Sequence, residues 1–291
     1  MRVSGYLRGA PDRVKWRSNG RARMNKTTSN KGFPKLPSTL RAERRGKVAV
    51  LTLMRAGKRN ALDDPTVAGI EAFFSALPDG IGAIVLNGDG EHFSAGLDLS
   101  ELSERDVRAG IEHSRSWHRA FQHIEFGKAP VVAVLHGAVI GGGLELAAAA
   151  HVRVAERSAF YALPEGSRGI YVGGGASVRL PALIGTSRVM EMMLTGRTLN
   201  AEEGHAIGLS HHLVENGKGL NTALELAERI AGNAPFTNYA ATHLLPRIAR
   251  SDPAAGYATE ALAAAIAQGE PEAKARLKAF LEKRGPKVAR R

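Results

Sequence analysis

The sequence predicts an α/β fold followed by a helical C-terminal region. From about residue 38, short β-type runs alternate with longer segments of helical periodicity, and after residue 161 strand signals become few. The chain has 291 residues with 44% hydrophobic content, enough to bury a sizeable core. We expect a core over residues 37–230 and a helical region over residues 231–291, whose apolar surface suits packing against another subunit.

The expected strands are short apolar runs. Lys47–Met54 alternates with period two, which is typical of a strand. Ala83–Asn87 and Val131–Leu135 are continuous apolar runs bounded by glycine or proline, as buried strands should be. Val152–Ala155 and Ala159–Tyr161 are also predicted as strands.

The expected helices have apolar residues at helical spacing. Pro65–Leu77 has a proline in its first turn, and Ile111–Ile124 places Trp117 on an apolar face, so we expect this tryptophan in the core. His113 and His118, in the same segment, are expected to be solvated. Four further segments are predicted as helices: Ser187–Thr195, Ala201–Gly208, Leu220–Ala231 and Ala254–Lys283.

The net charge of +12 comes from the two ends of the chain. Residues 1–36 hold ten basic side chains and one acidic one, and residues 283–291 hold five basic ones, so the body between them carries 25 basic and 27 acidic side chains. Residues 1–36 lack the apolar segment of a secretory signal; they are Arg-rich and acid-poor like a transit peptide, but their amphipathic pattern is poor. We expect them to be a disordered basic leader, or sequence upstream of the internal Met24.

Composition also limits the compartment and the chemistry. The chain has no cysteine, which fits a reducing compartment, and we expect a cytoplasmic location. No apolar run approaches the roughly 18 residues of a membrane-spanning helix. The histidines show no metal-binding spacing such as H-E-x-x-H, and no G-x-S-x-G elbow marks a serine nucleophile.

Two glycine-containing segments are suited to bind an oxyanion. In His92–Leu99 (HFSAGLDL), small residues allow the backbone to approach a ligand closely. After the strand Val131–Leu135, three glycines from Gly141 lead into a helix, whose first amides lie at a positive dipole end. A dinucleotide-binding fingerprint does not fit here, because G-x-G-x-x-G/A would place Leu146 at its last small position.

Two glutamates are the candidate acid and base. Glu145 stands in an otherwise apolar helix, where an ionised carboxylate is costly unless it is paired or used. The alternative is an ordinary first-turn glutamate favoured by the helix dipole. Burial would raise its pKa and the dipole would lower it. Glu165, in a Pro-Glu turn, has the alternative of an exposed loop carboxylate; together, two carboxylates can share a water molecule.

Four segments together resemble the enoyl-CoA hydratase/isomerase, or crotonase, superfamily. They are Arg55–Leu62 (RAGKRNAL), His92–Leu99, Gly137–Leu146 (GAVIGGGLEL) and Leu194–Leu209, in family order over about residues 40–285. The resemblance implies a crotonase-like ββα spiral core with a C-terminal helical oligomerisation region. It also implies assembly as a homotrimer or homohexamer.

The resemblance also implies site roles. The amides of Leu97 and Gly142 would form an oxyanion hole for a thioester oxygen, while Glu145 and Glu165 would handle water and proton. The implied reaction is reversible hydration of a 2-enoyl-CoA to a 3-hydroxyacyl-CoA. Coenzyme A is then part of the substrate, and neither a separate cofactor nor a metal is implied. Five residues are expected to contact substrate or CoA: Lys58, Ala95, Asp98, Leu99 and Gly141.

Departures from the family pattern leave the acyl group open. His136 stands where asparagine is usual, Ala56 and Val172 where proline is usual, and His151 where aspartate is common, while Arg168 adds a cation to the loop that shapes the acyl pocket. Two alternative functions remain. One is an isomerase, dehydratase or racemase of the same family; the other is an RNA-binding protein on this fold, which the near-neutral body argues against.

Overall fold

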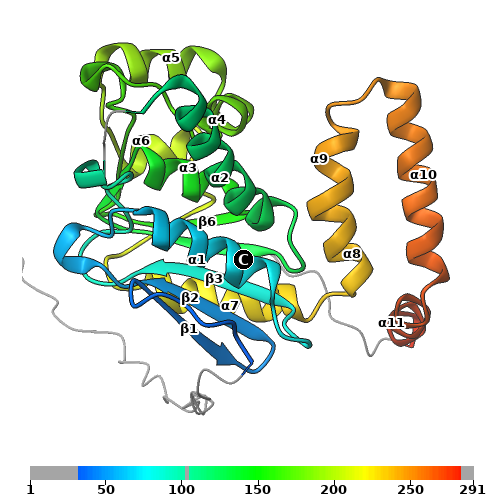
Figure 1. The fold of residues 1–291 in the computed structure, drawn as a ribbon. Helices are drawn as coiled ribbons and strands as arrows, with labels where there is room; N and C mark the ends of the chain where they lie inside the picture. Colours follow the sequence, from blue (N-terminus) through cyan, green and yellow to red (C-terminus); the bar gives the residue numbers. More distant parts are fainter. Residues whose placement is uncertain (1–31, 102–104, 283–291) are drawn as a thin grey trace, which may run out of the picture.

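A six-stranded sheet lies at the centre of the molecule (Figure 1). This computed structural model describes residues 32–101 and 105–282, so residues 1–31 of the predicted leader lie outside the described residues. The strands follow one another in the spatial order β1 (Leu40–Arg45), β2 (Val48–Leu53), β3 (Ala83–Gly88), β4 (Val131–Leu135), β6 (Val152–Glu156) and β9 (His212–Val214). β1 is antiparallel to β2 and the remaining neighbours are parallel.

A second, smaller sheet has three strands. It consists of β5 (Ala138–Ile140), β7 (Phe160–Ala162) and β8 (Leu199–Asn200), with β5 parallel and β8 antiparallel to β7. Strands and helices alternate along the chain, so the predicted α/β fold is confirmed. The predicted strands are found within one or two residues of their expected bounds.

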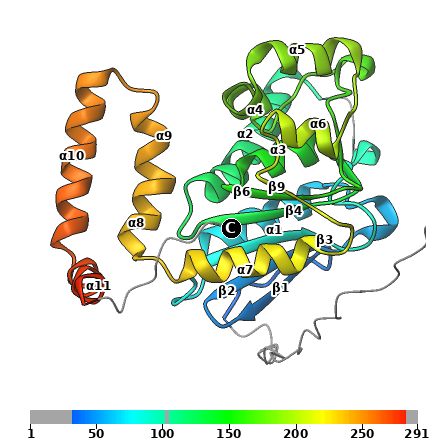
Figure 2. The ribbon, with the colours of Figure 1, turned by 180° about the vertical axis from the view of Figure 1, so that it is seen from behind.

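The side chains of β2 show how the large sheet is covered. Leu51 and Leu53 face the larger apolar core together with α1 (Asp64–Ser75) and α2 (Val107–Glu125), whereas Val50 faces the opposite side, towards α7 (Gly219–Ala231). This alternation is the period of two that a strand imposes. Figure 2 shows α7 lying along the back of the sheet.

The remaining helices of the body stand above the sheet in Figure 1. They are α3 (Gly142–Ala149), α4 (Ala176–Ile184), α5 (Thr186–Thr195) and α6 (Ala201–Ala206). Three short 3₁₀ turns connect elements near the site described below: η1 (Ala56–Lys58), η2 (Leu99–Glu101) and η3 (Gly166–Arg168). α4 was not predicted, because a glycine triplet precedes it and Pro181 lies inside it.

The C-terminal helices stand to one side of the body in both ribbon views (Figures 1 and 2). They are α8 (Pro235–Tyr239), the π-helical turn η4 (Ala240–Leu244), α9 (Leu245–Ile248), α10 (Pro253–Gly269) and α11 (Pro271–Leu281). At the body, Nε2 of His243 lies 3.0 Å from the carbonyl oxygen of Phe126, and the guanidinium of Arg247 lies 4.6 Å from the centre of the Phe126 ring.

The predicted single helix over 254–283 is wrong in one respect. Glu270 adopts an extended conformation (φ −64°, ψ 135°) before Pro271 and separates α10 from α11. A residue before proline avoids the helical region for steric reasons, which explains the break. Lys283 lies outside the described residues.

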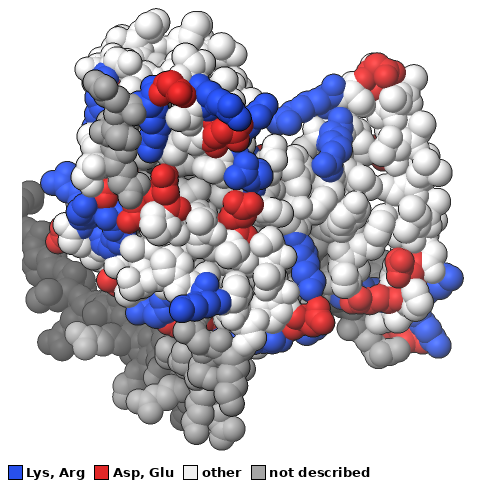
Figure 3. Space-filling view, viewed as in Figure 1, with Lys and Arg blue, Asp and Glu red and all other residues white. Residues whose placement is uncertain are grey.

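Large apolar side chains are exposed on the C-terminal helices. They are Tyr239, Leu245, Tyr257, Leu262, Ile266, Leu277, Phe280 and Leu281. None of the helices in the described part of the chain is long and apolar enough to cross a lipid bilayer. Acidic and basic side chains are interspersed over the face shown in Figure 3, as expected from the near-neutral body.

Candidate active site

A cavity of about 370 Å³ lies between α2, the start of α3 and the loop of residues 170–174. Four of the predicted site residues line it: Leu97, Gly142, Glu145 and Glu165. They come from three segments far apart in the sequence, so their meeting is a product of the fold. The candidate acid, base and oxyanion-binding amides therefore share one cavity.

The amides of Leu97 and Gly142 lie close together because the segment Ser94–Leu97 docks against β5. The Ser94 amide donates to the carbonyl of Ala138 at 2.9 Å, and the Ile140 amide donates to the carbonyl of Ser94 at 3.1 Å. A Cβ on Gly142 would lie 3.3 Å from the Leu97 nitrogen. Within the described residues, no group accepts a hydrogen bond from either amide.

Glycine is required at two positions beside these amides. Gly96 has a φ of +86°, which disfavours a side chain, and a Cβ there would lie 2.9 Å from the Gly142 nitrogen. A Cβ on Gly142 would lie 2.6 Å from the ring of Trp117. The buried indole thus closes the space over Gly142, and Leu97 and Gly142 both line the cavity.

Glu145 is buried at the base of the cavity, with 3% of its surface exposed. Its Oε1 accepts hydrogen bonds from the amides of Gly174 at 2.8 Å and Ala176 at 2.9 Å. Burial raises the pKa of this carboxyl, against the lowering effect of these amides and of the Arg179 charge. Burial therefore outweighs the hydrogen bonds and the charge that favour the ionised form of Glu145.

Glu165 is also buried, at 6% exposed, so the alternative of an exposed turn carboxylate is wrong. Its Oε1 lies close to Gly141, because a Cβ on that glycine would be 2.7 Å from Oε1. Its Oε2 is buried and has no hydrogen-bond partner among the described residues. Burial raises the pKa of Glu165, and the nearby charge of Glu145 raises it further, while Arg168 lowers it.

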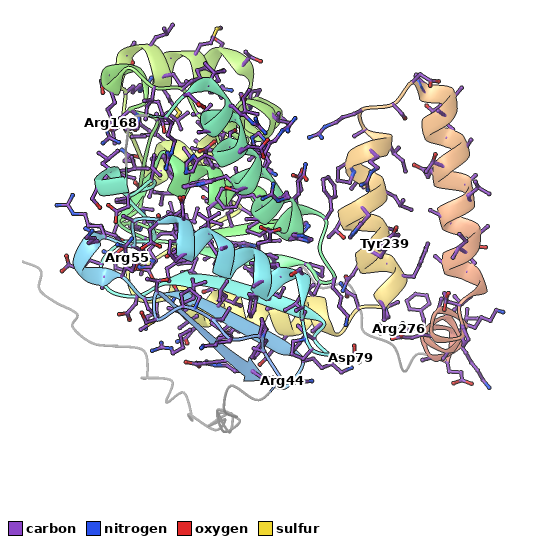
Figure 4. All side chains as sticks on the ribbon, in the orientation of Figure 1. Arg44, Arg55, Asp79, Arg168, Tyr239 and Arg276 are labelled. Carbon is purple, nitrogen blue, oxygen red and sulfur yellow. The ribbon has the colours of Figure 1, made fainter. Side chains whose placement is uncertain are left out.

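A second cavity, of about 350 Å³, adjoins the first at Leu97. Its lining includes four of the five residues expected at the substrate or CoA: Lys58, Ala95, Asp98 and Leu99. The fifth, Gly141, lines neither cavity and lies beside Glu165, whose Oε1 would be 2.7 Å from a Cβ on Gly141. Arg59 and Arg168 also line the second cavity, which therefore has three cations at its surface. In Figure 4, Arg168 and Arg55 lie along the same edge of the molecule, away from the C-terminal helices.

Asp98 binds three side chains at the second cavity. Oδ2 accepts from the Arg55 guanidinium at 2.7 Å and from Nζ of Lys58 at 3.1 Å, and Oδ1 accepts from the Ser100 hydroxyl at 2.6 Å. Hydrogen bonds from Ser100 and then from Arg55 hold the pKa of Asp98 well below its usual range. Its carboxylate is therefore occupied in positioning Lys58.

The sequence profile described as enoyl-CoA hydratase/isomerase matches residues 43–291. The chain belongs to this family. This hydratase/isomerase family member is 34% identical over 196 residues to a short-chain-enoyl-CoA hydratase of Clostridium acetobutylicum, covering 66% of this chain and 75% of the relative. It is 31% identical over 210 residues to the 2,3-dehydroadipyl-CoA hydratase of Escherichia coli, covering 72% and 82%.

A solved structure from Rhodopseudomonas palustris CGA009, provisionally assigned as an enoyl-CoA hydratase, superimposes with a TM-score of 0.84 at 54% identity. The match covers 86% of this chain and 98% of that one. The crotonase-like fold of this hydratase/isomerase family member is thereby confirmed. Within residues 32–101 and 105–282, no group of three or more histidine, aspartate or glutamate side chains could hold a metal ion.

Sequence reasoning missed several residues of this hydratase/isomerase site. Trp117, correctly expected in the core, also lines the first cavity. His113 lines it too, with its Nε2 3.1 Å from Oδ1 of Asp64 and 19% of its side chain exposed, so this histidine is part-solvated. His118 is part-buried, and burial lowers its pKa. A helical spacing of four between His113 and Trp117 could have placed both on one face.

Proposed function

We propose that this protein catalyses the reversible hydration of a 2-enoyl-CoA to a 3-hydroxyacyl-CoA. One observation carries the proposal: two buried carboxyls with raised pKa values line the same cavity as two amides that have no acceptor among the described residues. An isomerase needs the oxyanion site and one acid–base group, whereas hydration uses a second group to deliver water. Both glutamates are present, which favours hydration.

The amides of Leu97 and Gly142 would bind the thioester carbonyl oxygen. As water adds to C3, negative charge moves to this oxygen, and two converging N–H groups stabilise the enolate more than the ground state. Each such donor contributes on the order of 3–4 kcal/mol where one has been deleted in other enzymes. The donors belong to the main chain, so they are fixed before the substrate arrives.

The two glutamates would divide the proton transfers. The carboxylate of Glu145 takes a proton from water through Oε2, the oxygen that receives neither of the Gly174 and Ala176 bonds. The water oxygen forms its bond to C3 as the C2–C3 double bond opens to the enolate. The carboxylic acid of Glu165 then protonates C2, and the two carboxyls return to their starting states by proton exchange. Water and substrate supply every atom, so the step needs no resident cofactor.

The second cavity would bind the nucleotide part of CoA. CoA carries several phosphate charges, and Lys58, Arg59 and Arg168 supply the complementary cations. The Asp98 carboxylate would keep Lys58 in place. We further propose that copies of the chain assemble as trimers or hexamers through the exposed apolar side chains of the C-terminal helices.

A direct assay tests the proposed reaction. Wild-type protein mixed with crotonyl-CoA should remove the ultraviolet absorbance of the conjugated thioester, and Glu145→Ala should abolish the change. A panel of short, long, branched and aromatic enoyl-CoA substrates then defines the acyl group. If no member of the panel is hydrated while a double bond is shifted instead, the isomerase alternative is correct and the hydratase assignment is wrong.

A further inference from the structure

The glycines Gly173, Gly174 and Gly175 lie between two buried charges. On one side, the Gly174 amide donates to Oε1 of Glu145, and a Cβ on Gly174 would lie 3.0 Å from Oε2 of that carboxylate. On the other side, Nη1 of Arg179 donates to the Gly174 carbonyl at 3.0 Å. The backbone of Gly174 thus accepts a hydrogen bond from the Arg179 guanidinium and donates one to the Glu145 carboxylate.

Arg179 fits closely against this loop. It is buried, with 7% of its surface exposed, although it lies in the otherwise apolar helix α4. Gly175 has a φ of +105°, and a Cβ on it would collide with Nη1 of Arg179. The absence of side chains at 174 and 175 therefore lets the backbone pass between the carboxylate and the guanidinium.

Glu125, at the end of α2, binds the Nε side of the Arg179 guanidinium. Its Oε2 accepts from Nε of Arg179 at 2.7 Å. The same helix contacts the loop a second time, where the Ser114 hydroxyl donates to the Gly173 carbonyl at 2.7 Å. A buried arginine whose Nε and Nη1 bind different partners has little freedom to rotate, so it holds the loop against α2.

We propose that Arg179, anchored by Glu125, is a positioning residue that holds the Gly174 peptide so that its amide fixes Oε1 of Glu145. This inference rests on the proposed function of Glu145 as the base. It assigns to the second glycine triplet and to the buried Arg179–Glu125 pair a role in orienting the carboxylate, beyond stabilising the fold.

The charge of Arg179 also favours Glu145 as a base, in addition to the hydrogen bond by which Arg179 holds Gly174. It lowers the pKa of Glu145 against the larger raising effect of burial, so it favours the ionised base. Charged groups around this site also include Glu165, whose carboxyl interacts with Glu145, Arg168 beside Glu165, and Arg105, which lines the same cavity. His118 also faces Arg179, and burial together with that cation lowers its pKa, so it is neutral at pH 7.

The test compares three variants with a matched control. Arg179→Met removes the donor and the charge at similar size, Arg179→Lys keeps the charge, and Glu125→Gln removes the anchor's charge. Arg153→Met is the control: Arg153 is also buried, at 3% exposed, but donates to the carbonyls of Ala150 and Leu209. Each full-length protein is measured for kcat, KM and the pH dependence of kcat/KM on the best enoyl-CoA.

We expect Arg179→Met to lower kcat by about 10- to 100-fold with KM changed by less than about threefold, since a misplaced base costs rate more than affinity. The acid limb of its pH profile should move to higher pH. Arg179→Lys should move that limb back towards wild type, and Glu125→Gln should fall between. A loss that Arg153→Met reproduces, with the acid limb unmoved in Arg179→Met, would overturn the proposal.

Hydrogen–deuterium exchange gives a readout that does not need activity. The peptide covering residues 172–178 should exchange faster in Arg179→Met than in wild type. In Arg153→Met its exchange rate should equal that of wild type. If the wild type hydrates no enoyl-CoA, the proposed function fails while this measurement still tests the positioning. Unchanged exchange of that peptide in Arg179→Met would show that Arg179 does not hold the Gly174 amide.

Discussion

Gly174 donates its amide to Oε1 of Glu145 at 2.8 Å and lies so close to the carboxylate that a Cβ would stand 3.0 Å from Oε2. The same Cβ would lie 3.1 Å from the ring of Phe121. We therefore predict that Gly174→Ala displaces the carboxylate and lowers kcat by about 10- to 100-fold. Steady-state kinetics on crotonyl-CoA measure the effect.

Its comparison variant is Gly173→Ala. A Cβ on Gly173 would meet its nearest neighbour, Oγ of Ser114, at 3.7 Å, an ordinary contact. The loss of kcat should therefore be smaller than for Gly174→Ala. Equal losses in the two variants would mean that loop stiffness, and not the approach to Glu145, sets the rate.

The proposed acid–base pair predicts a bell-shaped dependence of kcat/KM on pH. Hydration requires one carboxyl ionised and the other protonated, and the pKa of each is raised above the ordinary value of 4.5. Activity should rise as the first proton leaves the pair and fall as the second leaves, so both limbs should lie above pH 4.5. Glu165→Gln should lower kcat by about 100-fold or more. A flat profile from pH 5 to 9 would contradict the assignment.

Glu145 should also reduce stability at neutral pH. Because its pKa is raised in the folded state, its favourable contribution is complete below the unfolded pKa and is lost as pH rises through the folded pKa. Glu145→Gln should therefore melt higher than wild type at pH 8. A gain of ~1 kcal/mol corresponds to about 2–4 °C in Tm for a domain of this size.

The size of this difference must depend on pH. Thermal unfolding followed by circular dichroism at pH 8 and pH 4 should show the gain shrinking at the lower value, where the wild-type carboxyl is protonated. A variant that melts below wild type at pH 8 would show that the Gly174 and Ala176 hydrogen bonds outweigh the cost of burying the charge.

The cations of the second cavity predict a selective effect on KM. Arg168→Ala and Lys58→Ala should each raise KM for crotonyl-CoA about two- to fivefold, since both side chains are exposed and screened by solvent. Neither should change kcat by a comparable factor. The increase in KM should vanish with a crotonyl-pantetheine thioester, which lacks the phosphates. An equal increase in KM with that substrate would mean that the CoA phosphates bind outside the second cavity.

The exposed apolar face of α10 predicts assembly. Leu262 and Ile266 are one helical turn apart and 67% and 51% exposed. The double variant Leu262→Asp, Ile266→Asp should lower the mass measured by light scattering from that of a trimer or hexamer to that of smaller species. Leu194→Asp, at a still more exposed position on α5 (83%), serves as the control. A monomeric wild type would contradict the proposed assembly.

The parts of the fold that could be predicted are those with strong local patterns. β3 and β4 are continuous apolar runs, and the segment that forms α2 has one apolar face, so their local patterns and tertiary burial agree. β1 was missed, because LRAERR is largely polar and lies at the sheet edge. β8 has two residues, too few for any period. The C-terminal break at Glu270 required attention to Pro271.

The site was predictable where its chemistry is carried by main-chain motifs or by an anomalous residue. Glu145 was found because a carboxylate stands in an apolar helix, and the same signal in α4 would have identified Arg179. Burial of Glu165 could not be predicted, because it depends on how the turn packs beside Gly141. The expected roles of Ala95 and Leu99 remain predictions, although both line the second cavity.

The proposed oxyanion hole uses the amide nitrogens at 97 and 142, so no side-chain exchange at position 97 other than to proline removes a donor. The first cavity is also lined by Ile170, Tyr171 and His113, where we propose that the acyl chain of the substrate lies. Redesign for a bulkier or more polar acyl chain can therefore concentrate on those three positions while the reacting centre is left intact. Combinatorial libraries at 113, 170 and 171 offer a route to new thioester preferences on this scaffold.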